Sequence, residues 1–89
     1  MKIIEYGRDF KKDLKRILKR QQRLSKLDVI VTMLQNDEAL PDRCRPHKLS
    51  GTYKEYWDCH IEPDWILLYQ VDDTTLMLHR TGTHADLFK

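Results

Sequence analysis

Three histidines and one aspartate are the side chains of this sequence best suited to chemistry. His60 and Asp64 flank Pro63 in the segment CHIEPDW, and His47 and His84 lie on either side of that segment. An imidazole titrates near neutral pH, so it can both accept and donate a proton there. If the four side chains converge, one could take the proton of a ribose 2′-hydroxyl while another protonates the departing 5′-oxygen, which is the chemistry of RNA cleavage.

Metal binding or a purely structural role would also fit these residue types. Imidazole and carboxylate ligands suit zinc or another divalent ion, but no H-x-x-x-H or H-E-x-x-H spacing is present, so we expect no metal and no cofactor. An Asp after Pro can be only a turn residue. Trp65, at the start of a strand, more often belongs to a core than to a base-stacking platform. His79 lies in mid-strand, where we expect a structural role.

The positive charge is concentrated near the N-terminus. Residues 8 to 26 contain nine Lys or Arg and two Asp, whereas residues 27 to 89 contain six Lys or Arg and eleven Asp or Glu. A dense basic helix can be a solvated surface or a contact for a phosphate backbone. The protein could therefore dock on a nucleic acid with one surface and cut with another. The basic residues expected to make this contact are Lys11, Lys12, Lys15, Lys19 and Arg20.

The first half of the chain predicts one strand and two helices. KIIEY is rich in strand formers and ends at Gly7. A helix of about 15 residues is expected from Asp9, because apolar residues recur at helical spacing; they are Phe10, Leu14, Ile17 and Leu18. A second helix is expected over 26–36, with Ser25 as its N-cap, and its apolar stripe consists of Leu27, Ile30, Val31 and Leu34. The short link predicts a helical hairpin.

The second half predicts three strands. TYKEYWDCHIE alternates between apolar and polar residues, with Asp58 and His60 on the wet face. WILLYQV is almost wholly apolar, as in a central strand, and TTLMLHRTGT follows an Asp-Asp turn. The order β-α-α-β-β-β indicates an α+β fold, a mainly antiparallel sheet with the helical hairpin on one face. The face of Trp65 depends on whether the loop before it has two or three residues.

The length of 89 residues and 40% hydrophobic content predict a single domain over residues 1–89. Two cysteines are too few for a disulfide framework, so we expect reduced thiols in a cytosolic protein. The N-terminal residues lack the apolar region of a signal peptide, and no run is long enough to span a membrane.

Three motifs together resemble the RelE superfamily of bacterial toxins, in particular its YafQ-like branch. They are H-x-L-x-G beginning at His47, H-I-x-P-D-W-x-L-x-Y beginning at His60, and R-T-G-T-H-x-x-L-F beginning at Arg80. The resemblance implies a RelE/ParE-like fold and a ribosome-dependent endoribonuclease that cuts messenger RNA and is inhibited by a co-expressed antitoxin. It also implies a bacterial cytoplasmic location and, as partners, the antitoxin, mRNA and the ribosome with its 16S rRNA.

The resemblance also implies which residues act. The family's catalytic residues carry over onto His47, His60, Asp64 and His84. Trp65, Arg80 and Phe88 occupy supporting positions. We expect His84 to be the general acid, and His47 or His60 with Asp64 to form the base. The alternatives are a toxin of the same fold that inhibits a protein such as gyrase without cutting RNA, and a binding module whose histidines are structural.

Overall fold

The structure, a computed structural model, describes residues 1–20, 23–49 and 55–88. Within these residues the chain forms one sheet, three α-helices and a short 3-10 turn, η1. In chain order the elements are β1 (Ile3–Tyr6), α1 (Arg8–Lys19), α2 (Leu24–Gln35), η1 (Asp42–Cys44), β2 (His47–Lys48), β3 (Trp57–Glu62), β4 (Trp65–Val71), β5 (Thr75–Gly82) and α3 (His84–Leu87). None of the described helices is long and apolar enough to cross a membrane.

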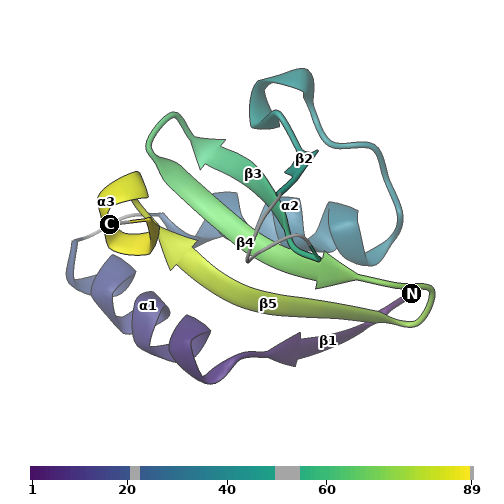
Figure 1. Ribbon diagram of the computed structural model, residues 1–89, viewed down its shortest axis with the longest axis horizontal. Coiled ribbons are helices and arrows are strands. Elements are labelled where there is room, and N and C mark those ends of the chain that lie inside the picture. Colours follow the sequence, from purple (N-terminus) through teal and green to yellow (C-terminus); the bar gives the residue numbers. More distant parts are fainter. Residues whose placement is uncertain (21–22, 50–54, 89) are drawn as a thin grey trace.

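The sheet has the strand order β1-β5-β4-β3-β2 (Figure 1). β1 pairs with β5 in parallel, and the other neighbours are antiparallel. β4 is the central strand, and its residues from Trp65 to Tyr69 are buried. Both faces of β4 are covered, which explains why its sequence is continuously apolar. The predicted α+β fold with a mainly antiparallel sheet is confirmed.

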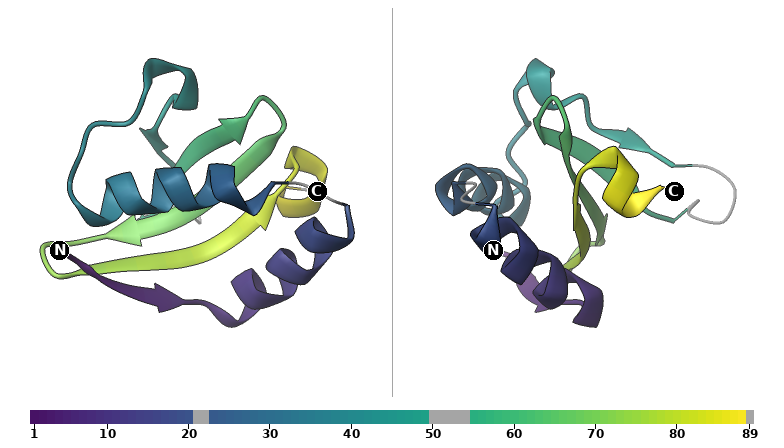
Figure 2. Two further views of the ribbon diagram at one scale, coloured as in Figure 1. Left: turned by 180° about the vertical axis from the view of Figure 1, so that it is seen from behind. Right: turned by 90° about the vertical axis from the view of Figure 1, so that its left-hand side faces the viewer.

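Two layers of unequal size cover the sheet. α1 and α2 lie on one face and α3 lies on the other, as the right-hand view of Figure 2 shows. The larger core, between the sheet and the two long helices, contains Phe10 and Ile17 of α1 and Leu27 and Ile30 of α2. Leu18 does not join it, because its side chain is 57% exposed. The predicted apolar stripe of α1 is therefore narrower than its sequence suggests.

The start of α2 differs from the prediction. The helix begins at Leu24 with Arg23 as its N-cap, and the cap has no side-chain hydrogen bond. Ser25 therefore lies inside the first turn, where the Lys26 N–H already donates to the Arg23 carbonyl. Burial of Leu27, Ile30 and Val31 holds this helix in place. Residues 21 and 22, in the predicted hairpin link, lie outside the described residues.

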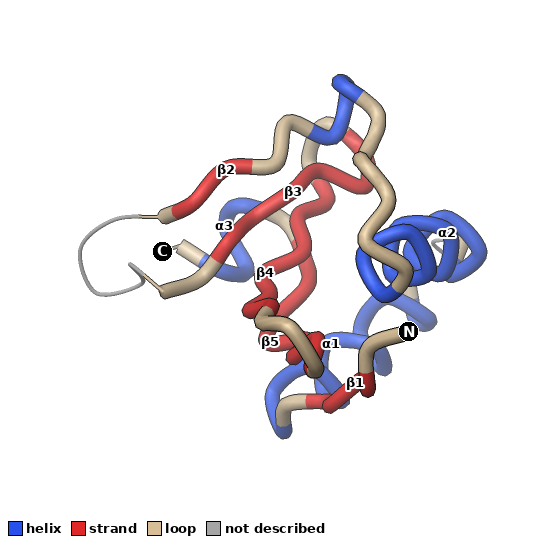
Figure 3. Tube along the Cα trace, turned by 90° about the vertical axis from the view of Figure 1, so that its right-hand side faces the viewer, coloured by secondary structure: helices blue, strands red, loops and turns tan. Residues whose placement is uncertain are grey.

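Three short elements were not predicted. β2 has two residues, η1 has three and α3 has four, too few to show a period in the sequence. Figure 3 shows β2 beside β3, with α2 and α3 on opposite sides of the sheet. The start of α3 is fixed by a capping box, in which Thr83 Oγ1 accepts from the Asp86 N–H and the Asp86 carboxylate accepts from the Thr83 N–H.

A buried carboxylate joins α1 to the end of β5. Asp13 is 1% exposed. It accepts hydrogen bonds from Arg80 Nε at 2.7 Å and from the Thr81 backbone N–H at 3.0 Å. Arg16 Nη2 lies 3.2 Å from the same carboxylate. A buried charge is tolerated when it is paired and hydrogen-bonded in this way, so Asp13 fixes the position of α1 against the strand that leads to α3.

Replacing Asp13 with Asn should lower the free energy of unfolding by about 2–4 kcal/mol, because the buried Thr81 N–H and the two guanidinium groups would face a neutral amide. Urea denaturation measures the loss. The matched control is Asp9→Asn, an exposed carboxylate on the same helix, which should cost less than about 1 kcal/mol. Equal losses in the two variants would contradict a special role for Asp13.

Candidate catalytic site

The face of the sheet opposite α1 and α2 carries a small core of its own. Ile66 and Leu68 of β4 pack with Leu87 of α3, and Leu49 and Phe88 cover the edge of this group. α3 therefore rests on the sheet and is not a free C-terminal tail. This packing brings His84, the first residue of α3, to the face where β3 displays His60.

The turn between β3 and β4 has two residues, Pro63 and Asp64, because Glu62 pairs with Trp65. The register shifts between His60 and Glu62, which marks an irregularity at the end of β3. Trp65 consequently faces the larger core and is 1% exposed. Its Nε1 donates to Thr81 Oγ1 at 2.8 Å.

The expected role of Trp65 beside RNA therefore needs correction. A side chain enclosed between the sheet and the helices cannot stack on a base. Its indole instead connects the start of β4 to the end of β5. Asp64 directly precedes β4, and α3 follows β5. The choice of face that the sequence left open is decided by the two-residue turn.

Asp64 acts on the backbone of α3. Its Oδ1 accepts from the His84 N–H at 3.1 Å, across 20 residues of sequence. His84 is exposed, and its ring lies 5.3 Å from the ring of Phe88, with an angle of 49° between the planes. Asp64 thus holds the backbone of His84, and Phe88 contacts its imidazole ring.

A carboxylate that sequence analysis did not select lies beneath these histidines. Asp58 is 4% exposed, although the alternation of β3 placed it on the wet face. β2 covers it, because His47 is the strand partner of Asp58 and His47 Nδ1 lies 2.8 Å from Asp58 Oδ1. Burial raises the pKa of Asp58, and the charges of His47, His60 and His84 oppose that rise. We call these three imidazoles, gathered around Asp58, the histidine cluster.

Nearby oxygen atoms indicate where His47 and His60 carry their protons. Nδ1 of His47 faces two oxygen atoms, Asp58 Oδ1 and the Arg45 carbonyl at 3.2 Å. Nδ1 of His60 lies 3.2 Å from the Pro63 carbonyl. We therefore infer that each neutral ring carries its proton on Nδ1, which leaves Nε2 as the acceptor. Asp58 Oδ1 lies 2.8 Å from His47 Nδ1, but among the described residues it accepts no well-directed hydrogen bond.

Arg80 is committed to Asp13 through two of its nitrogen atoms, Nε at 2.7 Å and Nη2 at 3.2 Å. Its side chain is 24% exposed. His79 stacks on Tyr56 with 4.5 Å between ring centroids. Burial is the main cause that lowers the pKa of His79, with the charge of Arg80 second. This stack agrees with the structural role expected of His79.

The described residues show two further features that bear on the chemistry. No group of three or more His, Cys, Asp or Glu side chains in this part of the chain is arranged to hold a metal ion.

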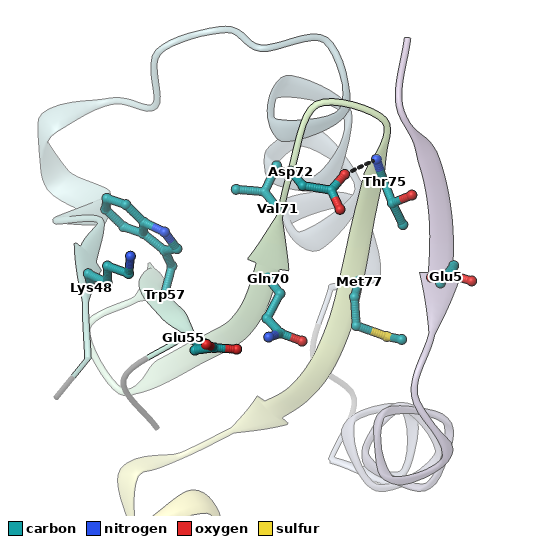
Figure 4. A pocket seen from close by; sticks show the side chains of 9 residues that line it. All are labelled: Glu5, Lys48, Glu55, Trp57, Gln70, Val71, Asp72, Thr75 and Met77. Atoms are coloured by element: carbon teal, nitrogen blue, oxygen red, sulfur yellow. Dashed lines mark hydrogen bonds between the residues drawn. The ribbon is translucent and has the colours of Figure 1, made fainter. Parts of the chain in front are cut away.

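A hollow of about 430 Å³ lies near the β4–β5 turn (Figure 4). Three carboxylates, those of Glu5, Glu55 and Asp72, line it together with Lys48, so the net negative charge of its walls does not suit RNA. Asp72 also closes the turn by accepting from the Thr75 N–H at 2.8 Å.

The chain is similar to known proteins over nearly all of its length. A family model described as the bacterial toxin of type II toxin-antitoxin systems, YafQ, matches residues 2–89. The mRNA interferase toxin YafQ of Escherichia coli strain K12 is 45% identical over 86 residues, which are 96% of this chain and 94% of that protein.

Two solved structures extend the similarity to the fold. The crystal structure of YafQ from E. coli BL21(DE3) has a TM-score of 0.94 and 42% identity, with both chains fully covered. The toxin in the crystal structure of the E. coli DinJ-YafQ toxin-antitoxin complex has a TM-score of 0.91 and 44% identity, covering 99% of this chain and 98% of that chain.

The raised pKa of Asp58 predicts a pH-dependent stability. The folded state favours the protonated carboxyl, so this contribution is fully present below about pH 4 and is lost as pH rises through the folded pKa. Wild type should therefore lose stability relative to Asp58→Asn as the pH is raised from about 4. Urea denaturation of both proteins at several pH values measures the difference. A difference that stays constant with pH would count against the burial of an ionisable Asp58.

Proposed function

Because the chain belongs to the YafQ family of toxins from bacterial type II toxin-antitoxin systems, we propose that it is an mRNA interferase that cuts with its histidine cluster. The observation that carries the proposal is the contact of His47 with the buried carboxylate of Asp58, on the face of the sheet away from α1 and α2. The charges of His60 and His84 also act on the pKa of this carboxyl. Perturbed titratable groups of this kind are typical of catalytic sites. The relative that is 45% identical is named an mRNA interferase.

The base of the reaction is His47. Its Nδ1 faces the Arg45 carbonyl and lies close to Asp58 Oδ1, so Nε2 is available to take the proton of a ribose 2′-hydroxyl. The 2′-oxygen then attacks the adjacent phosphorus, and the bond from phosphorus to the 5′-oxygen breaks. The products are a 2′,3′-cyclic phosphate and a free 5′-hydroxyl. Asp58 favours the imidazolium that forms on His47, much as a carboxylate orients histidine in other enzymes.

The acid of the reaction is His84, which gives its proton to the departing 5′-oxygen. Asp64 is a positioning residue, because it holds the backbone at the start of α3. Phe88 supports the ring of His84 from the other side. Arg80 supplies positive charge for the phosphate, where negative charge develops in the transition state, and His60 is a further contact for the substrate.

A gyrase-inhibiting toxin of the same fold is disfavoured. Such a toxin transfers no protons, so it has no use for a buried carboxylate that orients an imidazole. The relatives with 45% identity are named mRNA interferases. A binding module with structural histidines is disfavoured because His47 and His84 are exposed and pack little of their surface.

The partners we propose are a cognate antitoxin, the ribosome and messenger RNA. The related YafQ is seen in complex with DinJ, its antitoxin. Lys11, Lys12, Lys15 and Lys19 are exposed on α1, and α1 lies on the opposite side of the sheet from α3 (Figure 2). These lysines are our candidate contact with 16S rRNA, whose phosphates they would neutralise.

Arg20 differs from these lysines. Its guanidinium donates to the Asp86 carboxylate, with Nη1 to Oδ2 at 2.8 Å, and so joins the end of α1 to α3. This bond holds the pKa of Asp86 far below its usual range. We therefore assign Arg20 mainly to the support of α3, and only secondarily to the ribosome.

Replacing a catalytic histidine should abolish most of the activity. His47→Ala and His84→Ala should each lower the rate of mRNA cleavage on ribosomes by about 10²-fold or more, since each removes one proton transfer. Asp64→Ala should also slow cleavage, whereas Asp64→Asn should retain much of the rate because its side-chain oxygen can still accept the His84 N–H. Primer extension on ribosome-bound mRNA measures the rates.

The matched control is His79→Gln, which changes a histidine of the same sheet outside the histidine cluster and should stay within a few-fold of wild type. Expression in bacteria gives a second readout. Wild type should arrest growth and shorten transcripts, and His84→Ala should do neither. Equal toxicity of the two proteins would refute RNA cleavage as the toxic activity and favour a protein target.

Charge reversal on α1 should weaken ribosome binding and leave the fold intact. In the triple variant with Lys11, Lys15 and Lys19 changed to Glu, co-sedimentation with ribosomes should fall, and binding by wild type should decrease steeply with salt. A variant with the same three lysines changed to Gln should co-sediment with ribosomes less than wild type and more than the Glu variant. Unchanged sedimentation of the Glu variant would exclude this surface as the ribosome contact.

A further inference from the structure

A second hollow adjoins the histidine cluster. It measures about 450 Å³ and lies at the C-terminal end of β3. Its lining includes Lys26, Arg43, Arg45, His60, Glu62 and Pro63. We propose that this basic hollow binds a backbone phosphate of the mRNA, at the nucleotide next to the cleaved bond. The inference rests on the proposed function and adds a substrate subsite to it.

The charge of the hollow suits a phosphate. Three permanent cations come from α2 and from the segment of η1, and among the described residues the only carboxylate of the lining is that of Glu62. Glu62 Oε1 lies 3.1 Å from Lys26 Nζ, so it neutralises one cation and leaves the two arginines to face the space. Guanidinium groups bind phosphate oxygens through charged hydrogen bonds.

The two arginines are presented from an anchored turn. Cys44, between them, is 0% exposed and belongs to the larger core. Because Cys44 points inward, Arg43 and Arg45 project from the surface on either side of it, and both are exposed. Arg45 has a left-handed backbone with φ of 45°. The contact with His47 Nδ1 is made by the backbone carbonyl of Arg45, which a change of its side chain retains.

His60 belongs to both regions. It lines the hollow, and its charge reaches Asp58 in the histidine cluster. An RNA strand that runs from the histidine cluster into the basic hollow would pass this ring. A phosphate held in the hollow would therefore be a neighbour of the reacting phosphate. Such a contact exists before and during the reaction, so it should strengthen substrate binding and change the chemical step little.

The test measures single-turnover cleavage of ribosome-bound mRNA as a function of protein concentration. In the Arg43→Ala/Arg45→Ala variant the half-saturating concentration should rise about five- to tenfold, whereas the rate at saturation should stay within about threefold of wild type. Arg8→Ala, which changes the exposed first residue of α1, controls for the loss of a positive charge outside the hollow. Glu62→Gln should act in the opposite direction and lower the half-saturating concentration, because it removes the negative charge of the hollow.

The position of the phosphate can be located with modified mRNAs. A neutral methylphosphonate is placed at one linkage at a time on either side of the cleaved bond. In wild type one neighbouring linkage should be sensitive to the change, and this sensitivity should disappear in the double arginine variant, as expected for two groups that interact directly. NMR titration of each protein with a short uncleavable RNA should show shifts at Arg43 and Arg45.

The outcomes separate the inference from the function on which it rests. If wild type cleaves mRNA but the double variant has the same half-saturating concentration and the same methylphosphonate profile, the basic hollow is not a phosphate subsite and the proposed function stands. If wild type cleaves no mRNA on ribosomes, the proposed function fails. In that case the NMR titration still tests whether the basic hollow binds RNA. An absence of shifts at Arg43 and Arg45 would overturn the proposed phosphate subsite.

Discussion

The arrangement of this protein depends on one buried carboxylate, that of Asp13. It accepts hydrogen bonds from Arg80 and from the backbone of Thr81, and so attaches α1 to the end of β5. Thr81 continues the chain of contacts, because its hydroxyl accepts from Trp65 and donates to the Ile66 carbonyl. The end of β5 and the start of β4 are therefore fixed together. Asp64 and α3 extend from these two places, which sets the position of His84.

One face of the sheet contributes mainly to stability, and the other carries the candidate catalytic residues. The face under α1 and α2 contains the larger core and supplies most of the apolar burial. Among the described residues the other face has a small core around Ile66 and Leu68, and it displays imidazoles to solvent. Burial of Asp58 on this face costs stability when the carboxyl is ionised. Functional sites commonly retain groups of this kind at the expense of stability.

The long elements could be predicted because several turns or residue pairs repeat their pattern; β1, α1, α2, β4 and β5 all follow the expected order. β2 and α3 could not, since two to four residues show no period. Asp58 illustrates the same limit. Its register on β3 was predicted correctly, but only the pairing of β2 with β3 covers it with His47. The burial of Trp65 was decided by the length of one turn, which alternation along a single strand does not specify.

The central claim is that imidazoles of the histidine cluster transfer the protons of RNA cleavage. Its most direct test is the pH dependence of the single-turnover cleavage rate on ribosomes, at saturating protein, between about pH 5 and pH 8. The account predicts a profile that changes through this range, with apparent pKa values that belong to the coupled cluster, and a loss of one limb in His84→Ala. A rate that is constant over the whole range would contradict it.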